Sequence, residues 1–105
     1  MAETSRRQVA ETPEMRRLRR RIDALDRKIV ALLNERAELG RAMGRAKSAS
    51  GRRAIRDVER EREVLLRVTM ANTGPTPQTD LLAVYRRLMA VTRALETGDR
   101  KALKR

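Results

Sequence analysis

Cysteine, histidine, phenylalanine and tryptophan are all absent from this chain of 105 residues, and tyrosine occurs once, as Tyr85. Without cysteine and histidine, the chain has no disulfides, thiol nucleophiles, imidazole bases or usual zinc sites. Its apolar residues are Leu, Val, Ile, Met and Ala, which favours helices packed on helices over a β-sandwich or barrel. We therefore expect an all-α protein that works without any of the missing groups.

Long hydrophobic runs are also missing. Residues 1 to 15 contain no apolar stretch long enough for a secretory signal, and no segment approaches the roughly 20 apolar residues of a membrane span. We therefore expect a cytoplasmic protein with no membrane partner.

Negative charge is scarce relative to positive charge. The chain has 14 Asp and Glu residues and 26 Lys and Arg residues, which gives a formal net charge of +12. Most of the excess lies within residues 14–97, and the segment GDRKALKR at 98–105 adds to it. A basic balance of this kind suits nucleic acid, acidic lipid or a small polyanionic ligand.

Proline and glycine are few, and they mark the expected ends of helices. Thr12 before Pro13 is typical of an N-cap followed by the first helical residue. Gly51, which closes the segment SASG, is typical of a helix C-terminal stop, and NTGPTP at 72–77 is a clear helix breaker. The pattern therefore predicts three helices, over 13 to about 50, about 56–72 and about 78–97.

The two ends of the chain differ from the helical part. The first twelve residues are polar and aperiodic, as disordered segments are. We therefore expect a disordered tail over 1–13, a helical domain over 14–97 and a basic tail over 98–105. The basic tail either docks on a partner or serves as a disordered, solubilising end.

The first helix carries a heptad seam, because its apolar residues recur at alternating steps of three and four. They are Met15, Leu18, Ile22, Leu25, Ile29, Leu32, Leu39, Met43 and Ala46. Gly40 and Gly44 each cost about 1 kcal/mol inside a helix, so we expect them to mark a close approach of backbones. A helix of roughly 34 residues spans about 50 Å, too long for two shorter helices to cover. A second copy of the chain is expected to supply the rest.

Each helix places a polar residue where its stripe predicts an apolar one. These residues are Arg36 in the first helix, Glu61 in the second, and Thr92 with Glu96 in the third. Any one of them alone can be a side chain that reaches water or a buried pair that fixes register. A buried charge left unpaired costs several kcal/mol, so a cluster from three helices either pairs internally or binds a ligand.

Helical geometry brings two basic residues of the first helix together and separates a third. Lys47 follows Arg36 by close to three full turns, so the two side chains share one face. Arg19 precedes Arg36 by 17 residues, which places it about 100° around the helix and about 25 Å away. Arg19 could therefore reach the same pocket only from another subunit.

The charged segment RDVERER at 56–62 divides into two sets. Asp57 and Glu61 are four residues apart and share a face, and Arg60 borders the same surface. We expect these three to face inward. The solvated set consists of Arg56, Glu59 and Arg62.

Several of these segments together resemble the all-helical class of chorismate mutase. The likeness is carried by RRRIDALDRKIVALLNERAELGRAMGRAK, RDVERERE and YRRLMAVTRALE, and it covers residues 15–97. Each piece alone is weak, but the order LD, ER, GRAK and RDVERE is specific. The resemblance implies an intertwined homodimer of three-helix chains, which agrees with the length argument above.

The resemblance also implies cationic contacts to chorismate, a small dianion. Arg36 would bind one carboxylate, and Arg19 of the partner chain would bind a carboxylate in the same site. Lys47 would contact a carboxylate and the ether oxygen of the breaking bond. Arg60 would complete the cationic lining.

Four further positions acquire roles through the same resemblance. Glu61, with the backbone of Asp57, would hold the ring hydroxyl, and Thr92 would lie near the ring carboxylate. Glu96 stands where many members have Gln, which donates to the ether oxygen. Because only a protonated carboxyl group can donate, Glu96 would have to carry a proton to do the same.

The implied reaction fits the missing residue types. Conversion of chorismate to prephenate is an intramolecular pericyclic rearrangement that needs no cofactor, metal or nucleophile. Binding must hold the reactive conformer and stabilise negative charge on the ether oxygen, which a preorganised cationic pocket can do.

Other functions stay open on the sequence alone. The same fold could carry out isochorismate pyruvate lyase or 4-amino-4-deoxychorismate mutase chemistry, because Glu61 accepts hydrogen bonds from a hydroxyl or an ammonium group. A basic helical nucleic-acid binder is an alternative, although single-strand binding usually uses aromatic platforms and only Tyr85 is present. A third alternative is a module whose activity depends on a larger biosynthetic enzyme.

Overall fold

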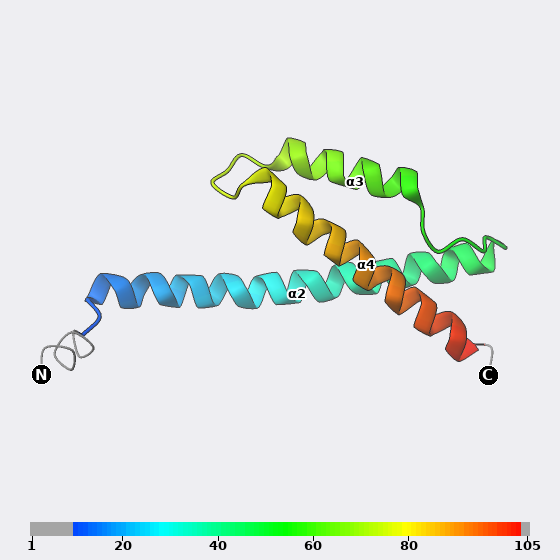
Figure 1. Cartoon of the computed structure of the whole chain (residues 1–105). Helices are drawn as coiled ribbons and strands as arrows, with labels where there is room; N and C mark the ends of the chain where they lie inside the picture. Colours follow the sequence, from blue (N-terminus) through cyan, green and yellow to red (C-terminus); the bar gives the residue numbers. More distant parts are fainter. Residues whose placement is uncertain (1–9, 104–105) are drawn as a thin grey trace, which may run out of the picture. The chain divides into compact units, whose positions relative to one another are not determined.

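The computed structural model describes residues 10–103, so part of the expected N-terminal tail and the last two residues lie outside the described residues. Residues 10–103 form three helices and no strand (Figure 1). The helices are α2 (Pro13–Ala49), α3 (Val58–Ala71) and α4 (Gln78–Leu103). The prediction of an all-α fold with one long and two shorter helices is confirmed.

Helix α2 begins and ends where its capping residues predict. The Thr12 hydroxyl accepts a hydrogen bond from the Met15 backbone N–H at 3.1 Å, as an N-cap does. Beyond Ala49, Gly51 takes a φ of +84° and its N–H donates to the Ser48 carbonyl at 3.1 Å. That left-handed φ favours glycine, which explains why the helix stops here.

Helix α3 begins two residues after the predicted start, because Asp57 is its N-cap. The Asp57 Oδ1 atom accepts a hydrogen bond from the Arg60 backbone N–H at 3.0 Å. After Ala71, the Asn72 side chain donates to the Thr76 carbonyl and to Gln78 Oε1, at 3.0 and 2.9 Å. The predicted breaker at 72–77 is therefore confirmed.

Helix α4 continues to Leu103, so the prediction that it ends near Thr97 was wrong. Gly98 does not take a positive φ and stays within the helix. Two contacts hold the added turns: Asp99 accepts hydrogen bonds from Arg41 at 2.9 and 2.8 Å, and Arg100 donates to the backbone carbonyls of residues 52 and 53. Much of the basic segment that begins at residue 98 is therefore helical.

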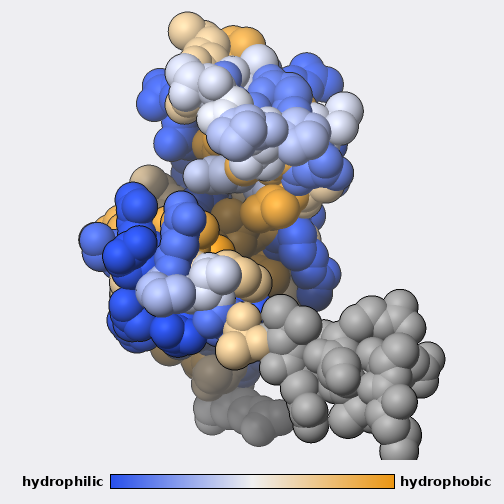
Figure 2. Space-filling model, turned by 90° about the vertical axis from the view of Figure 1, so that its left-hand side faces the viewer, coloured by the Kyte–Doolittle hydropathy of each residue, from blue (hydrophilic) through white to orange (hydrophobic). Residues whose placement is uncertain are grey.

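The chain divides into two compact units, one up to Leu32 and one from Leu33 onward. In the first unit, the described residues are mostly the first turns of α2, and their seam is open to solvent. Met15, Leu18, Ile22, Leu25, Ile29 and Leu32 are 45–62% exposed. Figure 2 shows hydrophobic side chains lying open among hydrophilic ones on the face that it presents.

In the second unit, α3 packs beside α4, and α4 crosses the end of α2 (Figure 1). The predicted close approach at Gly40 and Gly44 is present, although side chains rather than backbone make it. An added Cβ at Gly40 would lie 2.3 Å from Thr92 Cγ2, and one at Gly44 would lie 2.7 Å from Glu96 Cγ. The two glycines therefore let α4 lay these polar side chains directly on α2.

Within residues 10–103, no helix combines the length and the apolar character that crossing a bilayer would require.

Candidate active site

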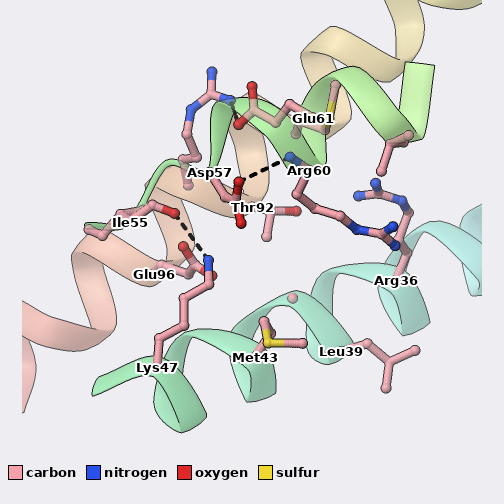
Figure 3. A pocket seen from close by; sticks show the side chains of 14 residues that line it. Arg36, Leu39, Met43, Lys47, Ile55, Asp57, Arg60, Glu61, Thr92 and Glu96 are labelled. Carbon is pink, nitrogen blue, oxygen red and sulfur yellow. Dashed lines mark hydrogen bonds and ion pairs between the residues drawn. The ribbon is translucent and has the colours of Figure 1, made fainter. Parts of the chain in front are cut away.

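A cavity of about 290 Å³ lies between the three helices of the second unit (Figure 3). Its lining contains four cationic side chains and three carboxyl groups among apolar ones. The lining residues are Arg36, Leu39, Gly40, Met43, Lys47, Ile55, Asp57, Arg60, Glu61, Val64, Met89, Thr92, Arg93 and Glu96. Its volume is close to the lower end of the range for small-molecule sites, about 300 Å³.

Seven of the eight residues singled out from the sequence line this one cavity. They are Arg36, Lys47, Asp57, Arg60, Glu61, Thr92 and Glu96. The eighth, Arg19, belongs to the first unit, where its Nε atom lies 2.5 Å from Glu11 Oε1 and its side chain is 68% exposed.

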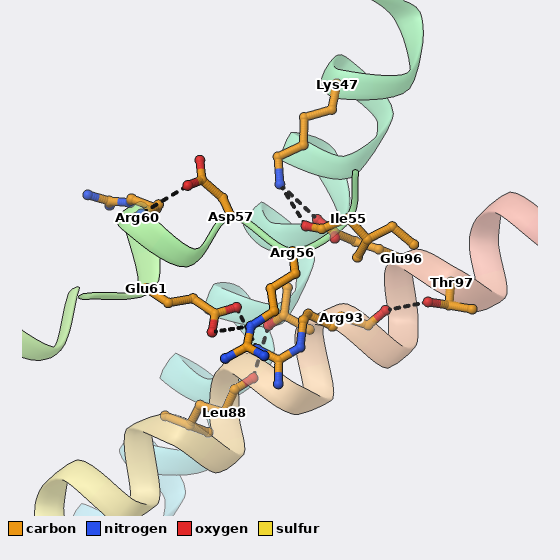
Figure 4. A network of polar contacts seen from close by, with 11 residues as sticks. Lys47, Ile55, Arg56, Asp57, Arg60, Glu61, Leu88, Arg93, Glu96 and Thr97 are labelled. Atoms are coloured by element: carbon orange, nitrogen blue, oxygen red, sulfur yellow. Dashed lines mark hydrogen bonds and ion pairs between the residues drawn. The ribbon is translucent and has the colours of Figure 1, made fainter. Parts of the chain in front are cut away.

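Lys47 and Glu96 form the most buried polar part of the cavity. The Lys47 Nζ atom donates to the Ile55 carbonyl at 3.2 Å and lies 4.0 Å from Glu96 Oε1. Their side chains are only 13% and 5% exposed. The ammonium group is therefore held at the cavity wall by one neutral acceptor and one carboxyl group (Figures 3 and 4).

Glu61 is held from two sides. Its Oε2 atom lies 2.5 Å from Arg93 Nη1, and its Oε1 atom accepts from Arg56 Nε at 3.2 Å (Figure 4). The Glu61 and Arg93 side chains are 16% and 30% exposed, whereas Arg56 is 61% exposed. These contacts join α3 to α4 through Arg93 and to the segment before α3 through Arg56.

Arg36 faces the cavity without a carboxylate partner. Its guanidinium carbon lies 5.7 Å from the centre of the Tyr85 ring, a cation–π distance. Among residues 10–103, no Asp or Glu oxygen lies within ion-pair distance of Arg36. A guanidinium held over an aromatic ring and free of a carboxylate is well placed to bind an anion.

Arg60 and Thr92 lie at the cavity with other partners. The Arg60 guanidinium donates to Glu63 Oε1 at 3.1 Å and its side chain is 54% exposed, so it stands at the edge of the cavity. The Thr92 hydroxyl donates to the Leu88 carbonyl of its own helix at 3.1 Å. Thr92 would have to turn its hydroxyl hydrogen away from that carbonyl to donate to a ligand.

The sequence analysis did not identify two polar groups of the site, the Arg93 side chain and the Ile55 carbonyl. Arg93 shares a helical face with Met89 and Glu96, four residues before it and three after it, and that spacing could have revealed it. The Ile55 carbonyl is a backbone group in the segment between α2 and α3, so no residue type could have indicated it. Arg56 is exposed as expected, yet it also pairs with Glu61.

The described residues contain no group of three or more Asp, Glu, His or Cys side chains that could hold a metal ion. The cavity instead offers ammonium and guanidinium groups from α2, α3 and α4. Groups of this kind bind carboxylates and stabilise negative charge that develops on oxygen. Fold and cavity together therefore define an all-helical domain with a cavity lined partly by cationic side chains.

Known proteins of this class match the chain. The family model described as chorismate mutase type II matches residues 18–97, and the chain belongs to that family. The chain is 37% identical over 87 residues to the bifunctional chorismate mutase/prephenate dehydratase of Aquifex aeolicus, covering 79% of this chain and 24% of that protein. The Stutzerimonas stutzeri protein of the same name is 35% identical over 98 residues, covering 90% and 27%. The chain thus spans about a quarter of the length of these curated relatives.

A solved structure also matches. The chorismate mutase of Thermus thermophilus, in its form II, has a TM-score of 0.75 to this chain and 30% sequence identity. The match covers 80% of this chain and 94% of that one.

Proposed function

We propose that this protein catalyses the pericyclic rearrangement of chorismate to prephenate, as a homodimer and without a cofactor. The observation that carries the proposal is the meeting of seven separately inferred residues around one cavity of about 290 Å³. Membership of the chorismate mutase type II family supports the same reaction.

Each cationic group has a task in this reaction. Arg36, which lacks a carboxylate partner among the described residues, binds one carboxylate of the substrate. Lys47 binds a carboxylate and the ether oxygen, where negative charge grows as the C–O bond breaks. Arg60 completes the positive lining at the exposed edge. Binding in the reactive conformer lowers the barrier without any covalent step.

The remaining site residues orient the ring. Glu61 and the Asp57 backbone hold the ring hydroxyl, and Thr92 lies beside the ring carboxylate. Glu96 donates to the ether oxygen, which requires its carboxyl group to carry a proton. These assignments are supported by the position of all four residues in the cavity lining.

The second copy of the chain has two tasks in this proposal. It covers the exposed seam of Met15 to Leu32, which is too apolar to stay open on a stable isolated chain. It also supplies Arg19, which brings a further cation to the substrate dianion. We further propose a cytoplasmic location. We also propose a larger biosynthetic enzyme as a partner, which can be tested by adding candidate enzymes to the activity assay.

Loss of chorismate absorbance with the isolated chain tests the proposal directly. Isochorismate and 4-amino-4-deoxychorismate, assayed on the same preparation, test the two related reactions. Turnover of chorismate at a rate far above the uncatalysed one supports the proposal. Salt-sensitive binding of duplex DNA without turnover of any of the three would instead support the nucleic-acid alternative.

The Lys47→Ala variant should lose most turnover and keep its helical circular dichroism signal. Loss of one preorganised donor to a developing oxyanion typically costs about 100-fold to 1000-fold in rate. Lys101→Ala is the matched control, because Lys101 is an exposed lysine on α4 that does not line the cavity. A Lys47→Ala variant with near-normal kcat would remove Lys47 from the mechanism.

A further inference from the structure

We propose that Arg93 is a specificity-determining residue, which makes the Glu61 end of the cavity accept a neutral hydroxyl group and disfavour an ammonium group. This inference rests on the proposed function and decides between two of its substrates. Glu61 alone accepts a hydrogen bond from either group, so the discrimination must come from what surrounds it.

The contacts around Glu61 fix its carboxylate and compensate its charge. Arg93 reaches Oε2 at 2.5 Å from α4, and Arg56 reaches Oε1 at 3.2 Å from the segment before α3 (Figure 4). A carboxylate has about four acceptor positions, so these two contacts leave about two positions open for a further donor. A substrate hydroxyl can therefore still donate to Glu61.

An ammonium group meets a different balance of charge at the same place. Glu61 pairs with two guanidinium groups, so the cluster of Arg56, Glu61 and Arg93 has a net formal charge of +1 before any ligand binds. A neutral hydroxyl loses nothing to this excess, whereas an ammonium group is repelled by two nearby like charges. The repulsion is substantial because Glu61 is only 16% exposed, which reduces screening by water.

Arg93 dominates this effect over Arg56 for two reasons. Its contact with Glu61 is the shorter one, and its side chain is 30% exposed against 61% for Arg56. Arg93 also lines the cavity, whereas Arg56 does not. Of these two guanidinium groups, Arg93 therefore contributes more to the charge that a ligand meets at this end.

A simpler role for Arg93 is structural, because its contact with Glu61 holds α3 against α4. A structural residue and a specificity-determining residue differ in one measurable way. Loss of a structural contact would lower the rates for all substrates by a similar factor, whereas loss of the charge should change the ratio of rates between a hydroxyl and an ammonium substrate.

The test compares kcat/KM for chorismate and for 4-amino-4-deoxychorismate in the wild type, Arg93→Met and Arg93→Lys. The wild type should prefer chorismate, and Arg93→Met should reduce that preference by about tenfold or more, the effect of one charge at a partly screened distance. Arg93→Lys keeps the charge and should keep most of the preference. Arg87→Met removes an exposed arginine from the same helix and should leave the ratio unchanged.

Each other outcome has a definite meaning. If the ratio of the two kcat/KM values is unchanged in Arg93→Met and both values are lowered equally, the inference is overturned and Arg93 has only a structural role. A wild type that prefers the ammonium substrate also overturns it, while keeping mutase chemistry. A wild type that converts neither substrate overturns the proposed function and the inference with it. If Arg93→Met loses its helical signal, Arg93→Gln, which keeps a donor to Glu61 without the charge, provides the same comparison.

Discussion

Glu96 is the residue whose setting constrains the proposed chemistry most. Its side chain is 5% exposed, its Oε1 atom lies 4.0 Å from Lys47 Nζ, and its stem packs on Gly44. At this position its carboxyl group lines the cavity beside the lysine ammonium group. It can donate a hydrogen bond there only when its carboxyl group carries a proton.

Glu96→Gln carries a permanent donor and should keep or raise kcat/KM for chorismate, whereas Glu96→Ala, which has no donor, should lose about 100-fold or more. The measurement is kcat/KM for chorismate at one neutral pH in wild type and both variants. Equal values for Glu96→Ala and wild type would exclude Glu96 as a donor to the ether oxygen.

The sequence could predict most of these residues but not all of them. Arg36 and Glu61 interrupt apolar stripes, which is a strong signal because burying an unpaired charge costs several kcal/mol. Arg93 does not interrupt the stripe that contains Thr92, so only its spacing from Met89 and Glu96 indicates it. Both Thr92 and Arg93 line the cavity, and this depends on the rotation of α4 about its axis, which only packing fixes.

The approach of α4 to α2 depends on Gly40, because any Cβ there would lie 2.3 Å from Thr92 Cγ2. Gly40→Ala should therefore destabilise the protein. Overpacking typically costs about 1–3 kcal/mol, which exceeds the gain of about 1 kcal/mol in helix propensity. Gly98→Ala is the matched control, because nothing lies within 4 Å of its added Cβ, and it should stabilise the protein by about 0.5–1 kcal/mol.

Urea unfolding followed by circular dichroism measures both variants. The double variant Gly40→Ala with Thr92→Ser should recover stability, because serine lacks the methyl group that the alanine meets. Equal stabilisation by Gly40→Ala and Gly98→Ala would contradict the close approach.

The added turns of α4 are tied to α2 by Asp99 and Arg41. The hydrogen bonds from Arg41 hold the pKa of Asp99 below its ordinary value, and the same contact raises the pKa of Arg41. A carboxyl group with a lowered folded-state pKa contributes stability above its unfolded pKa and loses it as pH falls through the folded value.

Asp99→Asn should accordingly lower the thermal unfolding midpoint near neutral pH, because the amide lacks the charge that Arg41 pairs with. The difference from wild type should begin to shrink as pH falls below about 4 and should vanish only below the lowered pKa of Asp99, where the wild-type carboxyl group is protonated too. A series of melting curves across that range measures the difference. A gap that stays constant with pH would show that the charge of Asp99 does not contribute.

The helix ends show which element boundaries a sequence can specify. Thr12, Gly51 and the breaker at 72–77 act locally, so their residue types predicted the ends of α2 and α3 closely. The end of α4 depends on contacts of Asp99 and Arg100 with distant segments. A long-range contact of this kind leaves no local signal, which explains why the helix extends beyond the predicted Thr97.

At the scale of the whole molecule, the exposed seam of the first unit is the feature from which we predict a second chain. Its apolar residues are about half exposed over the first five turns of α2. A heptad seam of that length is typical of a helix that packs along another helix. The predicted homodimer would cover the seam and bring Arg19 of one chain to the cavity of the other.

The most direct test of a shared site is activity in mixed dimers. Arg19→Ala and Lys47→Ala should each be nearly inactive alone. If each site combines Lys47 with the partner's Arg19, random mixing by unfolding and refolding the two variants together restores one intact site in each heterodimer. Activity should then return to about a quarter of the wild-type level, since half of the dimers are mixed. Activity no higher than that of the separate variants would contradict a site built from two chains.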